Sequence, residues 1–114
     1  MPLSIFRNTT LTVTRPDESV TIPNAWQNVF NQITTTDART LTLNSSVSFT
    51  SNSEIIVRNS SASSDAITIA LAGDFTADVS ADLGLIIPVG GIGQLKRIGA
   101  SNVWNFYGYI EGAA

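Results

Sequence analysis

The sequence predicts an all-β protein: a single-domain antiparallel β-sandwich or jelly roll with at most one short helix. Short runs of β-branched, leucine and aromatic residues recur along the chain, as in strands. Clusters of glycine, proline, asparagine and serine separate these runs about every 8–12 residues, a spacing typical of sandwiches and barrels. At 114 residues, 1–114 is expected to be one domain. No internal repeat is strong enough to predict a solenoid or a propeller.

The first expected strands alternate apolar residues with threonine. Strands are expected at residues 3–7 and 9–14, the second with one apolar and one hydroxyl face. Residues 15–17 form a turn, because Pro16 fixes its own φ and disfavours a helical residue before it. A short strand over 18–22 then ends at a second proline.

The stretch 24–33 changes its period and leaves two interpretations open. Trp26, Phe30 and Ile33 follow one another at spacings of four and three, which is one stripe of a helix. Asn24 would then serve as its N-cap. Alternatively, the stretch is a strand with Trp26 and Phe30 on one face. In both cases we expect Trp26 to plug one end of the sandwich rather than to stack on a sugar.

The middle of the chain alternates clear strands with polar connections. Strands are expected at 40–43, with Leu41 and Leu43 inward, at 54–58, and at 66–72. In the last of these, Ile67, Ile69 and Leu71 are expected to face inward. The connections are expected to be a loop at 34–37, a ragged edge strand or long hairpin at 44–53, a turn at 59–65 and a loop at 73–81 with Phe75 and Val79 tucked in.

The last third, residues 83–110, carries the strongest assembly signal. Two expected strands flank a glycine hairpin turn at 90–93, and an aromatic strand spans 103–110. Trp104, Phe106 and Ile110 should point to one side of that strand, and Val103, Tyr107 and Tyr109 to the other. A strand that is apolar on both faces is usually covered on both, and in so small a chain we expect another copy to supply the second cover. The candidate oligomer-interface or partner-contact residues are therefore Trp104, Phe106, Tyr107 and Tyr109. A carbohydrate groove lined by the two tyrosines is the alternative.

The composition argues against catalysis. The chain has neither cysteine nor histidine, which removes disulfides, thiolate metal sites and the commonest general base. We assign no catalytic, cofactor-binding or metal-binding residues and expect no enzyme. Asp74, Asp78 and Asp82 are spaced by four, but they lack the pattern of a calcium loop and are expected to be solvated charges.

The charge pattern gives no sign of nucleic acid or membrane as a partner. The formal net charge is −3, and the only basic pair, Lys96 and Arg97, is expected to be a solvated or interface-paired strand end. No stretch approaches the roughly 18 apolar residues of a membrane span, and residues 1–7 do not have the pattern of a signal peptide. We expect a protein that is made in a cytoplasm and either stays soluble or joins a particle there.

Four features of the C-terminal half together resemble the small β domains of tailed-bacteriophage virions. These features are the strand end at 56–60, the Ile-Thr-Ile strand at 67–69, the Pro-Val-Gly-Gly turn at 88–91 and the closing Trp-Asn-Phe-Tyr-Gly strand at 104–108. Such domains occur in head-decoration proteins, head fibres and tail-fibre tips, and are generally homotrimers. The N-terminal half shows no such likeness.

This resemblance implies a non-enzymatic virion structural protein. The expected function is a trimeric capsid decoration protein that binds the major capsid protein or another virion protein and stabilises the head surface. The alternative is a tail-fibre or head-fibre tip that recognises host surface polysaccharide.

Overall fold

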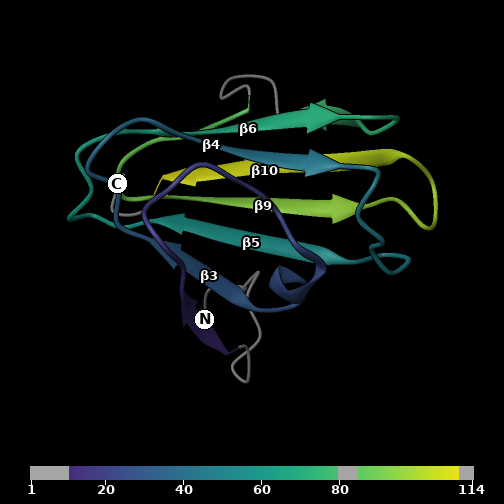
Figure 1. Ribbon diagram of the computed structural model, residues 1–114, viewed down its shortest axis with the longest axis horizontal. Helices are drawn as coiled ribbons and strands as arrows, with labels where there is room; N and C mark the ends of the chain where they lie inside the picture. The colour runs from purple at the N-terminus through teal and green to yellow at the C-terminus, as the bar shows by residue number, and fades with distance from the viewer. Residues whose placement is uncertain (1–10, 80–84, 111–114) are drawn as a thin grey trace.

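This computed structural model describes residues 11–79 and 85–110, which contain ten short strands and one 3₁₀ turn (Figure 1). The strand expected at residues 3–7 lies outside them. In chain order the elements are β1 (Thr12–Thr14), β2 (Val20–Thr21), η1 (Asn24–Trp26), β3 (Phe30–Ile33), β4 (Arg39–Asn44), β5 (Glu54–Asn59), β6 (Ile67–Ala72), β7 (Thr76–Val79), β8 (Ile86–Ile87), β9 (Gly91–Arg97) and β10 (Val103–Ile110).

The strands form two mixed sheets, which confirms the all-β prediction. One sheet has the order β1-β3-β5-β9-β10-β7, and the other has the order β2-β4-β6-β8. Three of the pairings, β5–β9, β9–β10 and β6–β8, are antiparallel, but the remaining five are parallel. The prediction of an antiparallel sandwich or jelly roll is therefore wrong about the strand directions.

The first six strands alternate between the two sheets and build a short β-solenoid. β1, β3 and β5 run parallel in the larger sheet, and β2, β4 and β6 run parallel in the smaller one. Each consecutive pair of strands forms one coil, so three coils stack. The sequence contains no internal repeat strong enough to predict this solenoid. Because Thr12 aligns with Phe30 and then Ile56, the coils differ in length, and no fixed period marks them in the sequence.

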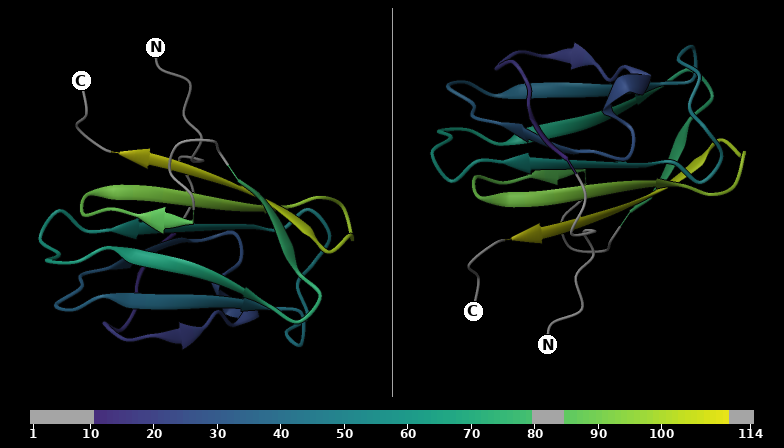
Figure 2. Two further views of the ribbon diagram at one scale, coloured as in Figure 1. Left: turned by 90° about the horizontal axis from the view of Figure 1, so that it is seen from above. Right: turned by 90° about the horizontal axis from the view of Figure 1, so that it is seen from below.

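The C-terminal strands cover the last coil. β9 pairs antiparallel with β5, and β8 pairs antiparallel with β6. β10 forms a hairpin with β9 and also pairs with β7. Figure 2 shows the first coil and β10 at opposite ends of the stack. The expected hairpin at 90–93 is wrong, because β8 and β9 lie in different sheets and the turn with Gly90 at φ 76° crosses between them.

The core fills the space between the two sheets. Leu41, Leu43, Ile67 and Ile69 are buried as expected, and Leu71 packs against them. One buried polar residue, Asn31, connects coils: its Nδ2 donates to the carbonyl oxygens of Trp26 (3.0 Å) and Ile56 (2.9 Å). Its Oδ1 accepts from Arg15 Nε at 2.8 Å. Asn31 thus satisfies backbone groups that would cost free energy if left buried and unpaired.

Residues 24–33 combine parts of both open interpretations. The 3₁₀ turn η1 spans Asn24–Trp26, and the strand β3 begins at Phe30. Pro23, not Asn24, occupies the N-cap position, and it makes no side-chain cap. Residues 45–53 contain turns rather than a strand, whereas β7 lies inside the loop expected at 73–81.

Candidate functional site

The alternation expected along β10 is confirmed at four positions. Trp104 and Phe106 are fully buried, whereas Val103 is 38% and Tyr107 52% exposed. The side chain of Tyr109, the fourth candidate contact residue, lies outside the described part of the chain. Among the candidate residues whose side chains are described, only Tyr107 therefore presents surface to a partner.

The inward side of β10 belongs to the core. The ring centroid of Trp104 lies 5.3 Å from that of Phe49 and 5.4 Å from that of Phe75, both in edge-on geometry. Such aromatic pairs contribute beyond the area that they bury. Trp104 Nε1 is buried without a hydrogen-bond partner among the described residues. Trp104 and Phe106 therefore stabilise the single chain and are not available for contact with a partner.

Arg97 anchors the end of β9 to residue 49 and to the turn at residues 100–101. Its Nη1 donates to the carbonyl of Phe49 (2.6 Å), its Nε to that of Ser101 (2.9 Å) and its Nη2 to that of Ala100 (3.1 Å). The guanidinium also lies over the Phe75 ring, 5.7 Å from its centroid. The sequence reading of Lys96 and Arg97 as a solvated or interface-paired end is wrong for Arg97, which binds the backbone of its own chain.

The opposite side of the hairpin forms the candidate site, which we call the β9–β10 outer face. Its end at the turn is apolar, because Ile98 (43% exposed) lies beside Val103 there. Farther along the hairpin, Asn105 lies opposite Lys96 and Tyr107 lies opposite Gln94. The β9–β10 outer face therefore consists of Gln94, Lys96, Ile98, Val103, Asn105 and Tyr107.

A row of four residues crosses this face from β5 to β7 and includes charges of both signs. Lys96 lies opposite Glu54 on β5, and Asn105 lies beside Asp78 on β7. Gln94 Nε2 donates to Glu54 Oε2 at 2.9 Å, and Lys96 Nζ donates to the carbonyl of Asn52 at 3.0 Å. This mixed row gives little long-range attraction, so binding at this face must come from apolar contact and short-range hydrogen bonds.

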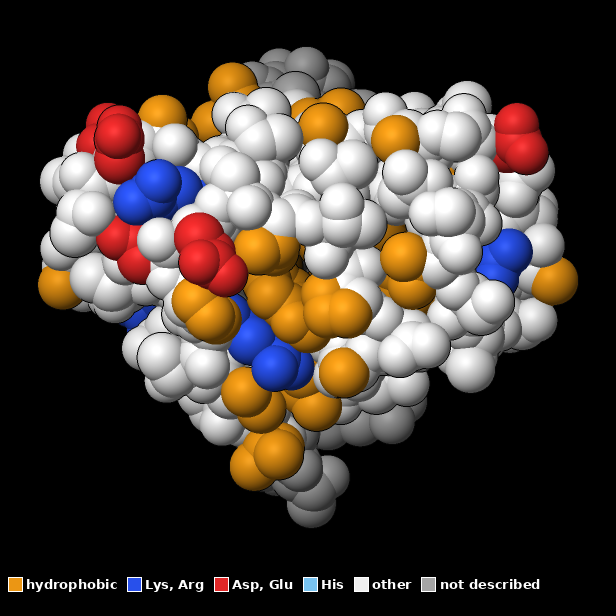
Figure 3. Space-filling view, viewed as in Figure 1, with side chains coloured by type: hydrophobic (Ala, Val, Ile, Leu, Met, Phe, Trp, Pro, Cys, Tyr) orange, Lys and Arg blue, Asp and Glu red, His pale blue; other side chains and the backbone are white. Residues whose placement is uncertain are grey.

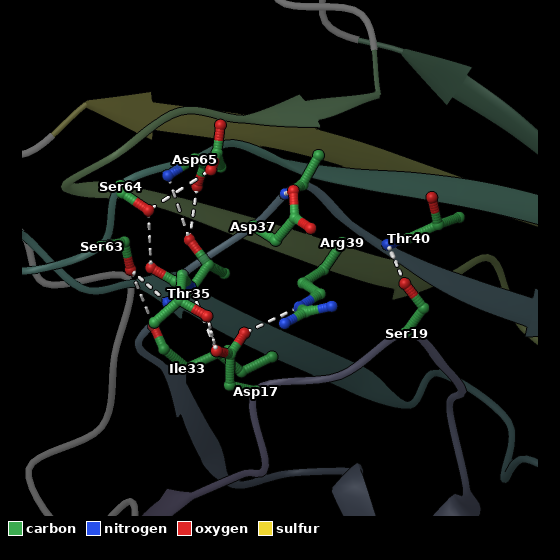
Figure 4. Close-up of polar contacts among 12 residues, drawn as sticks. Asp17, Ser19, Ile33, Thr35, Asp37, Arg39, Thr40, Ser63, Ser64 and Asp65 are labelled. Carbon is green, nitrogen blue, oxygen red and sulfur yellow. Dashed lines mark hydrogen bonds and ion pairs between the residues drawn. The ribbon is translucent and has the colours of Figure 1, made fainter.

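A second polar cluster joins the turns between the two sheets (Figure 4). Asp17 accepts hydrogen bonds from Arg39 Nε (2.8 Å) and from Thr36 through Oγ1 (2.7 Å) and the backbone N–H (3.1 Å). These hydrogen bonds, with that from Arg39 the largest cause, lower the pKa of Asp17 to about 2. The cluster links the first coil to the second.

The third coil is held by the same row of turns. The backbone N–H of Thr35 donates to Ser63 Oγ (2.8 Å), and Thr35 Oγ1 donates to the carbonyl of Asp65 (2.7 Å). Each of these contacts joins two different coils, so no local sequence pattern marks them. Their groups satisfy one another, which indicates a structural role.

The remaining sequence candidates do not form a site. Among the described residues, no group of three or more acidic side chains, cysteines or histidines is placed to hold a metal; Asp82 lies outside them. Trp26 is 4% exposed and lies under the guanidinium of Arg15, 5.1 Å from the ring centroid. Its ring is thus covered, in line with the plug interpretation. The described residues contain no helix long and apolar enough to span a membrane.

Comparison with known proteins gives no relative: no protein-family model, no curated protein and no solved structure matches this chain.

Proposed function

We propose that this protein is a non-enzymatic structural protein of a bacteriophage virion, which assembles as a homotrimer and decorates the head by binding the major capsid protein. The observation that carries the proposal is the difference in burial between the two faces of β10. One side completes the core, while the other leaves Tyr107 and Val103 exposed beside Ile98. Tyrosine is enriched in protein interfaces because its ring is apolar and its hydroxyl can remain partly wet.

Assembly through the β9–β10 outer face fits the physical character of the chain. The charged fraction is 13%, so the protein has few groups for electrostatic steering or for ion-pair recognition. A trimer presents each capsid-binding surface three times, and multivalent attachment strengthens binding without new kinds of contact. The rigid solenoid would hold these surfaces in fixed positions.

One observation favours a second function, a head-fibre or tail-fibre tip that binds host surface polysaccharide. The half-exposed ring of Tyr107 lies opposite the amide of Gln94, and the amide of Asn105 is on the same face. An aromatic ring with amides beside it suits the apolar face and the hydroxyls of a sugar.

Immunogold electron microscopy distinguishes these functions. Particles released from cells that carry this gene would be labelled with an antibody against the purified protein. Decoration predicts gold over the heads, and a fibre tip predicts gold at the ends of fibres. Particles without any label would contradict both functions.

A further inference from the structure

The outer face of the smaller sheet carries a regular grid of small side chains. In one row across the strands lie Thr21, Thr42 and Ala70, and in the next lie Thr40, Thr68 and Ile86. The residues between the rows, such as Leu41 and Ile69, are buried in the core, so the grid points outward. We call these six residues the threonine face.

The solenoid fixes the spacing of this grid. Neighbouring strands lie about 4.7–4.9 Å apart, and alternate residues along a strand lie roughly 6.4–6.8 Å apart. Parallel in-register pairing of β4 with β6 keeps Thr40 beside Thr68 and Thr42 beside Ala70. All six side chains carry a methyl group, and the four threonines add a hydroxyl. Methyl groups and hydroxyls therefore repeat in two directions on one sheet surface.

The six side chains of the threonine face carry no charge, and their hydroxyls have no partner among the described residues. None of its six residues is ionisable, and Figure 3 shows no acidic or basic side chain over β4 and β6 between the charged clusters at the ends of the sheet. The hydroxyls of Thr21, Thr40, Thr42 and Thr68 make no hydrogen bond to other described residues; only the backbone N–H of Thr40 is engaged, by Ser19 Oγ at 2.9 Å. These hydroxyls are available to an external lattice of donors and acceptors.

We propose that the threonine face binds ice. An ice surface is uncharged and presents a regular lattice of hydrogen-bond donors and acceptors. The methyl groups would order water into cages, because water cannot hydrogen-bond to them. The hydroxyls would hold this ordered layer by accepting and donating hydrogen bonds. A charged side chain would hold its own hydration shell and disrupt the match.

A neutral polysaccharide fits this face less well. Sugar sites use exposed aromatic rings as stacking surfaces, and the threonine face has none. Both tryptophans are buried, Trp26 beneath Arg15 and Trp104 within the core. This inference concerns a different surface from the β9–β10 outer face and is independent of the proposed virion function.

Ice adsorption and recrystallisation assays on the purified protein test the proposal. The wild type should be enriched in a slowly grown ice ball and should keep ice grains small during annealing. Thr68→Lys should weaken both effects at least tenfold. Thr12→Lys is the matched control, because Thr12 is also an exposed strand threonine but lies on the larger sheet; it should behave as the wild type. Circular dichroism would verify that both variants are folded.

A second pair of variants tests the role of the methyl groups. Thr40→Val with Thr68→Val retains the methyl grid and should keep most of the ice affinity, whereas Thr40→Ser with Thr68→Ser should lose most of it. Exclusion of the wild type from ice would overturn the proposal. Equal losses of ice affinity in Thr12→Lys and Thr68→Lys would also overturn it. So would binding of soluble glycans, or of a second copy of the chain, at the threonine face without any effect on ice.

Discussion

At the scale of single residues, Trp104 shows how one strand serves two purposes. It occupies the inward side of β10, packed edge-on against Phe49 and Phe75, while its neighbour Val103 faces outward. The period-two pattern of the sequence was enough to separate these two sides. It did not show which side a partner would meet, because burial depends on the other sheet.

Trp104→Ala should destabilise the folded chain by about 3–5 kcal/mol, since a fully buried indole is replaced by a cavity. Urea unfolding followed by fluorescence of Trp26 and by circular dichroism measures this free energy. Val103→Ala on the opposite side is the control and should cost about 1 kcal/mol or less. Equal losses for the two variants would show that the assignment of sides is wrong.

Asp17 should make stability depend on pH in the acid range. Its pKa is about 2 in the folded chain, below the ordinary value of 3.8. Its contribution is therefore fully present above pH 3.8 and is lost as the pH falls toward 2. Denaturation midpoints of the wild type should decline across that window, and Asp17→Asn should reduce the decline while lowering the midpoint at neutral pH.

Asp74→Asn is the matched control for Asp17, because Asp74 is exposed on a turn at residues 73–74. Its pH profile should follow that of the wild type. Parallel pH profiles for Asp17→Asn and the wild type would contradict the role assigned to the Asp17 carboxylate.

At the scale of elements, the end of β9 depends on a single side chain. Arg97→Lys removes the fork that donates to three carbonyls, and it should cost roughly 1–3 kcal/mol. Lys96→Met loses one exposed hydrogen bond and should cost less than about 1 kcal/mol. Limited proteolysis would add a local readout, with faster cleavage in residues 45–53 of Arg97→Lys. Indistinguishable variants would contradict the anchoring role.

Several elements were predictable from local pattern, and others were not. β5 and β6 are rich in β-branched residues bounded by polar turns, so their positions followed from the sequence. β7 has the sequence Thr-Ala-Asp-Val, a weak strand former that owes its state to pairing with β10. The pair Asp17 and Arg39 lies on successive coils, so its contact follows from the stacking of the coils rather than from the local sequence.

At the scale of the whole molecule, strand content was predictable but strand direction was not. Short strands separated by polar turns suit both a sandwich and a solenoid, because both place one face of each strand in a core. The coils vary in length, so they leave no repeat to detect. The outward positions of Val103 and Tyr107 were predictable, whereas their neighbour Ile98 entered the site only through the β9–β10 pairing.

In the proposed trimer, the β9–β10 outer face joins copies of this chain. Sedimentation velocity from nanomolar to micromolar concentrations tests this contact. We expect a trimer for the wild type and a folded monomer for Tyr107→Lys, because a charge is placed on a surface that must lose water. Thr12→Lys should remain trimeric. A wild type that sediments as a monomer at micromolar concentration, or a Tyr107→Lys variant with the same mass as the wild-type oligomer, would contradict the claim.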